Sequence, residues 1–233
     1  MSLRRIGALL IKEMQDIRTN TSQLAMLLIA PLMTFLYKGV LNMPADSSFT
    51  IGCLFAIVMT GIYSPSMMIA EEKEKHTLRV LMLSPATPFE VFASKGLVTL
   101  LIVFLLALLM LPVAGVSVGT PLLFVLTILI GTIFVILLGF IIGLLSANQM
   151  ATGYIGMPVY LVLLMVPMLG QATPSLAKLA KVVPSNYIGD GIYEALQGAP
   201  LGDGLLELGV LAGAAIVALV LLIIFYRRRE LAE

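Results

Sequence analysis

The sequence is poor in the residues that build most catalytic and metal sites. Its 233 residues include one histidine, His76, and one cysteine, Cys53. A single histidine cannot form a multi-histidine metal site, no HExxH motif is present, and one cysteine excludes an intrachain disulfide. The P-loop motif GxxxxGK followed by serine or threonine, which cradles ATP phosphates, is also absent. We therefore predict that this chain has no catalytic residue, binds no metal or cofactor, and is not itself an ATPase.

Charged residues are also scarce. They make up 12% of the chain and leave a formal net charge of +1, which gives no basis for nucleic-acid binding. Hydrophobic residues reach 60%, with a mean hydropathy of +1.06, whereas soluble domains are roughly 45–50% apolar. The composition therefore predicts an all-α integral membrane protein whose helices contact lipid.

Six apolar runs are long enough, or nearly so, to supply the roughly 20 helical residues that cross a bilayer. We place them at residues 24–41, 51–70, 97–118, 122–145, 154–169 and 205–226. The first and fifth are short and contain Pro31, Pro158 and Pro167. Little tilt, a thinned bilayer or a continuation into buried non-helical segments would each accommodate them.

The basic residues predict how these spans are oriented. An even number of spans places both termini on one side, and 11 of the 14 basic residues fall on that side. They are Arg4, Arg5, Lys12, Arg18, Lys73, Lys75, Arg79, Lys95, Arg227, Arg228 and Arg229. Only Lys38, Lys178 and Lys181 lie opposite. The positive-inside rule then predicts a multi-pass protein with cytoplasmic termini and a single membrane domain over residues 1–233.

Three segments outside the spans carry patterns of their own, and the first is residues 1–20. Apolar residues recur there on one face of a helix, at Leu3, Ile6, Gly7, Leu10, Met14 and Ile17. This pattern predicts an amphipathic helix on the inner membrane surface, and Asn20-Thr21-Ser22 then supplies capping residues for the start of the first span. A simple retention segment without a mechanical role fits the same pattern.

The second segment is the inner loop, residues 71–96. Glu71 and Lys75 form a favourable i, i+4 pair, and Thr87 to Glu90 reads as a capping box with proline at the first helical position. We therefore expect a short charged helix, a turn at Ser84-Pro85 and a second helix that starts near Pro88. The apolar residues of this loop need a protein partner, unless the loop packs only on the chain's own helix ends.

The third segment is the outer one, residues 171–204. Two short amphipathic patterns predict a pair of surface or re-entrant helices, with Gly198 as the stop of the second. The apolar face of the first comprises Leu176, Leu179, Ala180 and Val183, and that of the second comprises Ile188, Ile192, Ala195 and Leu196. The pair could cap a cavity or form a passive plug.

The spans themselves offer little chemistry. Their interiors carry no ionisable residue that would mark an ion pathway, so the energy for any transport is expected to come from elsewhere. Two GxxxG patterns predict close helix packing, one with Gly139 and Gly143 and the other with Gly209 and Gly213.

These features together resemble the permeases of type-2 ABC transporters, over nearly the whole chain. The sequence EEKEKHTL at residues 71–78, continued by LSP at 83–85, is similar to the family's inner loop, with His76 where glycine is usual. The sequence VPSNY at residues 183–187, followed by Glu194, is similar to the family's outer element. The resemblance assigns Pro184, Tyr187 and Glu194 to that element.

The resemblance also implies a mechanism. Two six-span subunits, expected to be identical, would form the pathway, and cytoplasmic ABC ATPase subunits holding ATP and Mg would drive it. Residues 71–85 would be the coupling helix, with the N-terminal helix and the loop 146–153 completing the contact surface. The coupling residues would be Glu71, Glu72, Glu74, Lys75, Thr77, Leu78, Leu81 and Met82.

Our leading hypothesis is therefore the membrane subunit of an ATP-driven exporter in a prokaryotic plasma (inner) membrane. Its substrate would be amphipathic, such as a drug, an antibiotic peptide or a lipid-linked compound. Lysine at position 72 or 74 is then expected to uncouple hydrolysis from transport without disturbing assembly. The alternatives are a self-sufficient channel or secondary transporter, and a membrane immunity protein that sequesters a peptide without transporting it.

Overall fold

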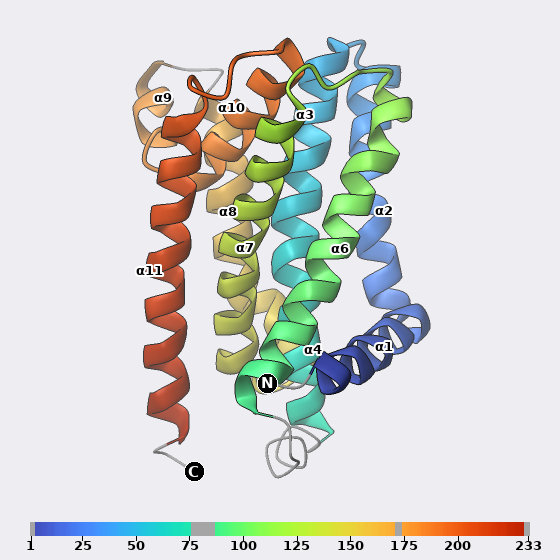
Figure 1. Ribbon diagram of the computed structural model, residues 1–233, viewed down its shortest axis with the longest axis vertical. Helices are drawn as coiled ribbons and strands as arrows, with labels where there is room; N and C mark the ends of the chain where they lie inside the picture. The colour runs from blue at the N-terminus through green and yellow to red at the C-terminus, as the bar shows by residue number, and fades with distance from the viewer. Residues whose placement is uncertain (1–2, 76–86, 171–173, 231–233) are drawn as a thin grey trace.

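The protein is a bundle of long helices with a helix across one end (Figure 1). The computed structural model describes residues 3–75, 87–170 and 174–230. Within these ranges every regular element is helical. The helices are α1 (Leu3–Thr19), α2 (Thr21–Phe35), η1 (Leu36–Val40), α3 (Ala45–Phe55), η2 (Ala56–Thr60), α4 (Gly61–Glu74), α6 (Pro88–Ala114), α7 (Pro121–Leu145), α8 (Gln149–Gly170), α9 (Pro174–Ala180), α10 (Pro184–Gln197) and α11 (Leu205–Glu230).

Six helical stretches in these ranges are long and apolar enough to cross a membrane, which confirms the six predicted spans. They cover Thr21–Val40, Ala45–Glu74, Pro88–Ala114, Pro121–Leu145, Gln149–Gly170 and Leu205–Arg228. The first is extended by the π-helical turn η1 rather than by a non-helical segment. The fifth starts at Gln149, not at residue 154, so only residues 146–148 separate α7 from α8 and the expected loop 146–153 is shorter.

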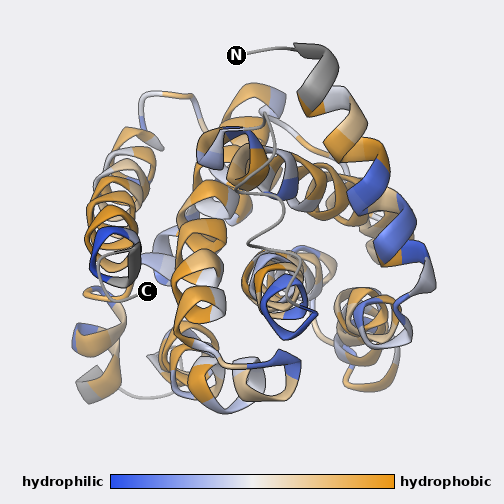
Figure 2. Cartoon of the chain, turned by 90° about the horizontal axis from the view of Figure 1, so that it is seen from below, coloured by the Kyte–Doolittle hydropathy of each residue, from blue (hydrophilic) through white to orange (hydrophobic). Residues whose placement is uncertain are grey.

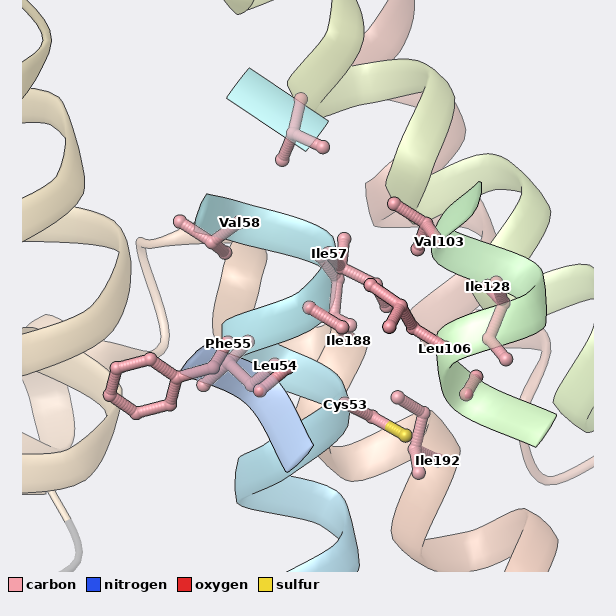
Figure 3. Close-up of a cluster of buried hydrophobic side chains, with 14 of the residues drawn as sticks. Cys53, Leu54, Phe55, Ile57, Val58, Val103, Leu106, Ile128, Ile188 and Ile192 are labelled. Atoms are coloured by element: carbon pink, nitrogen blue, oxygen red, sulfur yellow. The ribbon is translucent and has the colours of Figure 1, made fainter. Parts of the chain in front are cut away.

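The central span runs without a break through α3, η2 and α4 and is the most buried of the six. Small and hydroxyl residues such as Gly52, Ser64 and Ser66 let neighbouring helices approach it closely. Figure 3 shows the apolar core on one side of this span. Cys53 and Ile57 lie there with side chains from α6, α7 and α10, namely Val103, Leu106, Ile128, Ile188 and Ile192.

The remaining helices turn apolar side chains outward, as lipid contact requires. Residues of high hydropathy cover the outward faces of the helices when the bundle is seen from the α1 end (Figure 2). Leu28, Leu32 and Phe35 of α2, for example, are exposed. The chain is therefore a multi-pass membrane protein.

The outer helices follow the predicted pattern in most details. The apolar face predicted for α10 is buried, and Gly198 ends this helix in the left-handed region, at a φ of 77°. Ala180 and Val183 are also buried, but Leu179 of α9 is exposed. In Figure 1, α9 and α10 lie at the end of the bundle opposite α1.

The first GxxxG pattern lies in the contact between α7 and α4. A Cβ atom on Gly139 would stand 2.6 Å from the carbonyl oxygen of Ile62, and one on Gly143 would stand 2.9 Å from that of Ser66. By contrast, a Cβ on Gly209 or Gly213 of α11 would meet nothing within 4 Å among the described residues. The second pattern therefore makes no such contact within this part of the chain.

The difference in packing between Gly139 and Gly209 allows a matched pair of alanine substitutions to test the α4–α7 contact. We expect Gly139→Ala to destabilise the protein by about 1–3 kcal/mol, because the added methyl group meets backbone that cannot move aside. Gly209→Ala is expected to be neutral or to stabilise by up to about 1 kcal/mol, since alanine favours a helix over glycine. Thermal unfolding in lipid nanodiscs measures both. Equal midpoints for the two variants would contradict the close α4–α7 contact.

Candidate functional site

Buried charges gather at the end of the bundle where α1 lies, here called the α1 end (Figure 1). Lys95 of α6 is 0% exposed, although it precedes the apolar part of its span. Its Nζ donates to Glu13 Oε1 of α1 at 2.8 Å and to Glu72 Oε1 of α4 at 2.8 Å. One ammonium group therefore joins three helices.

A second lysine completes this arrangement. Lys12 Nζ lies 2.8 Å from Glu72 Oε1 and 3.2 Å from Glu13 Oε1, and 3.5 Å from Asp16 at the surface. We call Lys12, Glu13, Glu72 and Lys95 the charge network. Its two ammonium groups and two carboxylates cancel, which offsets the cost of removing each charge from water.

The ionisation of Lys12 reflects these partners. Partial burial lowers the pKa of this ammonium group, but the hydrogen bond to Glu72 and the charge of Glu13 outweigh burial and raise the pKa above its ordinary value. Lys12 is therefore protonated at neutral pH, and its bonds to both carboxylates are charge-assisted.

The polar residues that flank Glu72 extend the contacts of α4. The predicted i, i+4 ion pair of Glu71 and Lys75 is present, with Lys75 Nζ 2.5 Å from Glu71 Oε1. This contact raises the pKa of Lys75. Glu71 Oε2 also accepts from Asn20 Nδ2 at 3.5 Å. Asn20 caps α2 as predicted, because its Oδ1 accepts from the backbone N–H of Gln23 at 3.1 Å.

Lys73 and Glu74 contact the junction between α7 and α8. Lys73 Nζ donates to the carbonyl oxygen of Leu144 at 2.9 Å and to that of Ser146, at the C-terminal end of α7. Glu74 Oε2 accepts from the backbone N–H of Gln149 at 3.1 Å, at the start of α8. A cation at a helix C-terminus and an anion at a helix N-terminus both suit the helix dipole.

Five consecutive residues, Glu71 to Lys75, thus connect the last turn of α4 with α1, the α1–α2 corner, α6, α7 and α8. A displacement of this turn would act on all of these helices.

The predicted coupling residues are only partly described. Glu71, Glu72, Glu74 and Lys75 lie together in this last turn. Thr77, Leu78, Leu81 and Met82 fall outside the described residues, as do Ser84 and Pro85. Beyond them the predicted capping box is present, since Thr87 Oγ1 accepts from the N–H of Glu90 and Glu90 Oε2 accepts from the N–H of Thr87.

Three members of the charge network, Lys12, Glu13 and Lys95, were not among the predicted coupling residues. Glu13 lies three residues after Leu10 and four before Ile17, on the face of α1 that packs against α4 and α6. Met14, which the pattern placed on that face, is exposed. The position of an acid among apolar neighbours could have indicated that Glu13 is buried. Lys95 gave no such signal, because it resembled an ordinary charged residue at the end of a span.

The predicted outer residues lie far from this site, at the α10 end. Pro184 begins α10, and the Tyr187 hydroxyl donates to the carbonyl of Lys181 at 2.8 Å. Burial raises the pKa of Glu194, and the neighbouring carboxylates of Glu207, Asp190 and Asp203 raise it further. The structure does not bring these residues together with the coupling residues.

Comparison with known families identifies the chain. Residues 42–224 match the family described as ABC-2 family transporter protein. This chain belongs to the ABC-2 transporter family. The match includes Glu72 and Lys95 of the charge network and begins after α1, which carries Lys12 and Glu13. A search of curated proteins found no match.

Members of the ABC-2 family are membrane components of ABC transporters and associate with an ABC ATPase. Among the described residues, no group of three or more histidine, cysteine, aspartate or glutamate side chains could hold a metal ion.

Proposed function

We propose that this chain is the membrane subunit of an ATP-driven exporter, and that the last turn of α4 passes movement from an ATPase to the bundle. The supporting observation is the set of contacts made by Glu71 to Lys75, which bind α4 to α1, α6, α7 and α8. These residues immediately precede residues 76–85, which complete the stretch that resembles the family's coupling segment.

In this proposal two copies of the chain form the pathway, and two ATPase subunits hold ATP and Mg. Both termini and the α1 end face the cytoplasm of a prokaryotic cell, because most basic residues lie at that end. Closure of the ATPase subunits on ATP moves the last turn of α4, and its charge-assisted bonds carry the motion to the other helices. The substrate is amphipathic, such as a drug, an antibiotic peptide or a lipid-linked compound.

The decisive experiment is purification of the tagged chain from its native membranes in mild detergent. We expect an ATP-hydrolysing subunit to co-purify in roughly equal amount, and liposomes containing the complex to transport an amphipathic dye only when ATP is supplied. A variant ATPase that cannot hydrolyse ATP is the matched control.

Three results would contradict the proposal. Transport by the isolated chain under an ion gradient would favour a secondary transporter or channel. Protection of cells that persists with the inactive ATPase would favour sequestration without transport. Recovery of the chain alone under gentle extraction, without nucleotide hydrolysis, would remove the support for a coupling role of residues 71–85.

A further inference from the structure

A small cavity lies within the bundle where α1, α2, α4 and α6 meet. Its volume is about 10 Å³, close to the minimum space that one water molecule needs. Most of its lining is apolar, but Gln23 of α2 and Thr60 and Ser64 of the central span contribute polar side chains. Tyr63 and Met26 also line it.

Two of these polar groups are buried without a partner. Gln23 is 4% exposed and Thr60 is 1% exposed, and neither Gln23 Oε1 nor Thr60 Oγ1 has a hydrogen-bond partner among the described residues. The hydroxyl of Ser64 is also buried, and Thr99 Oγ1 approaches it at the long distance of 3.5 Å. Buried polar atoms of this kind are costly unless they are hydrogen-bonded.

The cavity also adjoins an irregular part of the central span. Thr60 ends the π-helical turn η2, and such turns recur at functional sites. Five residues later, Pro65 has no N–H to offer to the carbonyl oxygen of Gly61. The helix is therefore less tightly hydrogen-bonded here than elsewhere, and α2 contacts it through an amide side chain rather than through apolar packing alone.

The size and chemistry of the cavity define its occupant. An apolar ligand would leave the amide and hydroxyl oxygens unpaired, and a metal ion would find no charged side chain among the lining residues. A molecule as small as water fits the volume and carries both the donors and the acceptor that such groups need.

We propose that the cavity binds one water molecule, which bridges Gln23 Oε1 of α2 to the hydroxyls of Thr60 and Ser64. The water donates to Gln23 Oε1 and to one hydroxyl, and it accepts from the other hydroxyl. The water connects α2 to the central span through hydrogen bonds, and these hydrogen bonds can exchange partners as the helices shift. This site is independent of the proposed transport function.

Substitution of Thr60 by valine tests the proposal, because the midpoint of thermal unfolding is expected to fall if the cavity holds water and not to fall if it is dry. Valine keeps the shape of threonine and removes the hydroxyl. In a hydrated cavity the water loses a partner, so we expect the midpoint of thermal unfolding in nanodiscs to fall by about 2–4 °C. In a dry cavity the same change removes an unpaired polar atom, so the midpoint would stay constant or rise.

Thr132→Val is the matched control. Thr132 of α7 is also buried with an unpaired Oγ1, but it does not line the cavity. We expect the unfolding midpoint of the Thr132→Val variant to be unchanged or raised.

Gln23→Met completes a double-mutant cycle with Thr60→Val, and a shared water predicts that the two effects are not additive. Additive effects would overturn the proposal. So would an unfolding midpoint of Thr60→Val that stays constant or rises, as expected for the Thr132→Val control.

A direct readout does not depend on stability. Millisecond X-ray exposure converts bound water to hydroxyl radicals, which oxidise adjacent side chains. Tyr63 and Met26 are partly buried, and we expect less oxidation of both in the Gln23→Met/Thr60→Val variant than in the wild type, with the fully buried Met110 unlabelled in both. Equal labelling of Tyr63 and Met26 in both proteins would show that no water is held between Gln23 and Thr60.

Discussion

Replacing Lys95 with methionine is expected to destabilise the protein by about 3–5 kcal/mol, one of the two largest effects we predict for a single substitution. Methionine fills the volume of the lysine stem but leaves Glu13 and Glu72 buried with only Lys12 between them. One of the two carboxylates then lacks a full partner in a region that excludes water. Unfolding of the purified protein in nanodiscs measures the loss.

Two further variants separate charge from packing. Lys178→Met removes an exposed lysine at the opposite end and is expected to change stability by no more than about 0.5 kcal/mol. The double variant Lys95→Met/Glu13→Gln leaves the 2.8 Å pair of Lys12 with Glu72, so most of the lost stability should return. If Lys95→Met were as stable as Lys178→Met, the three-helix contact through Lys95 would not exist in the membrane.

Replacing Glu74 with lysine is expected to reduce export at least about tenfold while ATP hydrolysis by the complex continues. The change removes the acceptor for the N–H of Gln149 and places a cation beside the positive end of the α8 dipole. Loss of a charge-assisted bond of about 1.5–3 kcal/mol supports an effect of that size. Dye export and ATP hydrolysis, measured on the same reconstituted complex, test the prediction.

The structure distinguishes position 74 from position 72 for this purpose. Glu74 is exposed, so its variant should assemble normally, whereas lysine at position 72 would place a third ammonium group beside Lys12 and Lys95 in a buried site. Lysine at position 72 is therefore expected to impair folding as well as coupling. Asp203→Lys, a charge reversal at the other end, is the control for Glu74→Lys. Normal export by the Glu74→Lys variant would remove Glu74 from the coupling path.

The spans were predictable because length and hydrophobicity alone determine whether a helix can cross a bilayer. Local signals at helix ends were equally direct, as with Asn20, the Thr87–Glu90 capping box and Gly198. The start of α8 was missed because its first residues, Gln149 to Gly153, are too polar to belong to an apolar run although they are helical.

The contacts of the candidate site were less accessible from sequence. Helices that are apolar on all sides give no indication of which face meets a neighbour, so the packing of α7 and α11 was open. Lysines near the ends of spans usually extend into water, and this made Lys95 look unremarkable. Its burial depends on two acids that lie 82 and 23 residues away in the chain.

The exact cancellation of charge in the network has a consequence for how the protein responds to membrane voltage. An unbalanced elementary charge that moves across the whole membrane exchanges about 2.3 kcal/mol with a potential of 100 mV. Lys12, Glu13, Glu72 and Lys95 sum to zero, so their joint displacement along the membrane normal would do almost no electrical work. Displacement of the charge network should therefore add almost no voltage dependence to export, which rate measurements in polarised and depolarised vesicles would test.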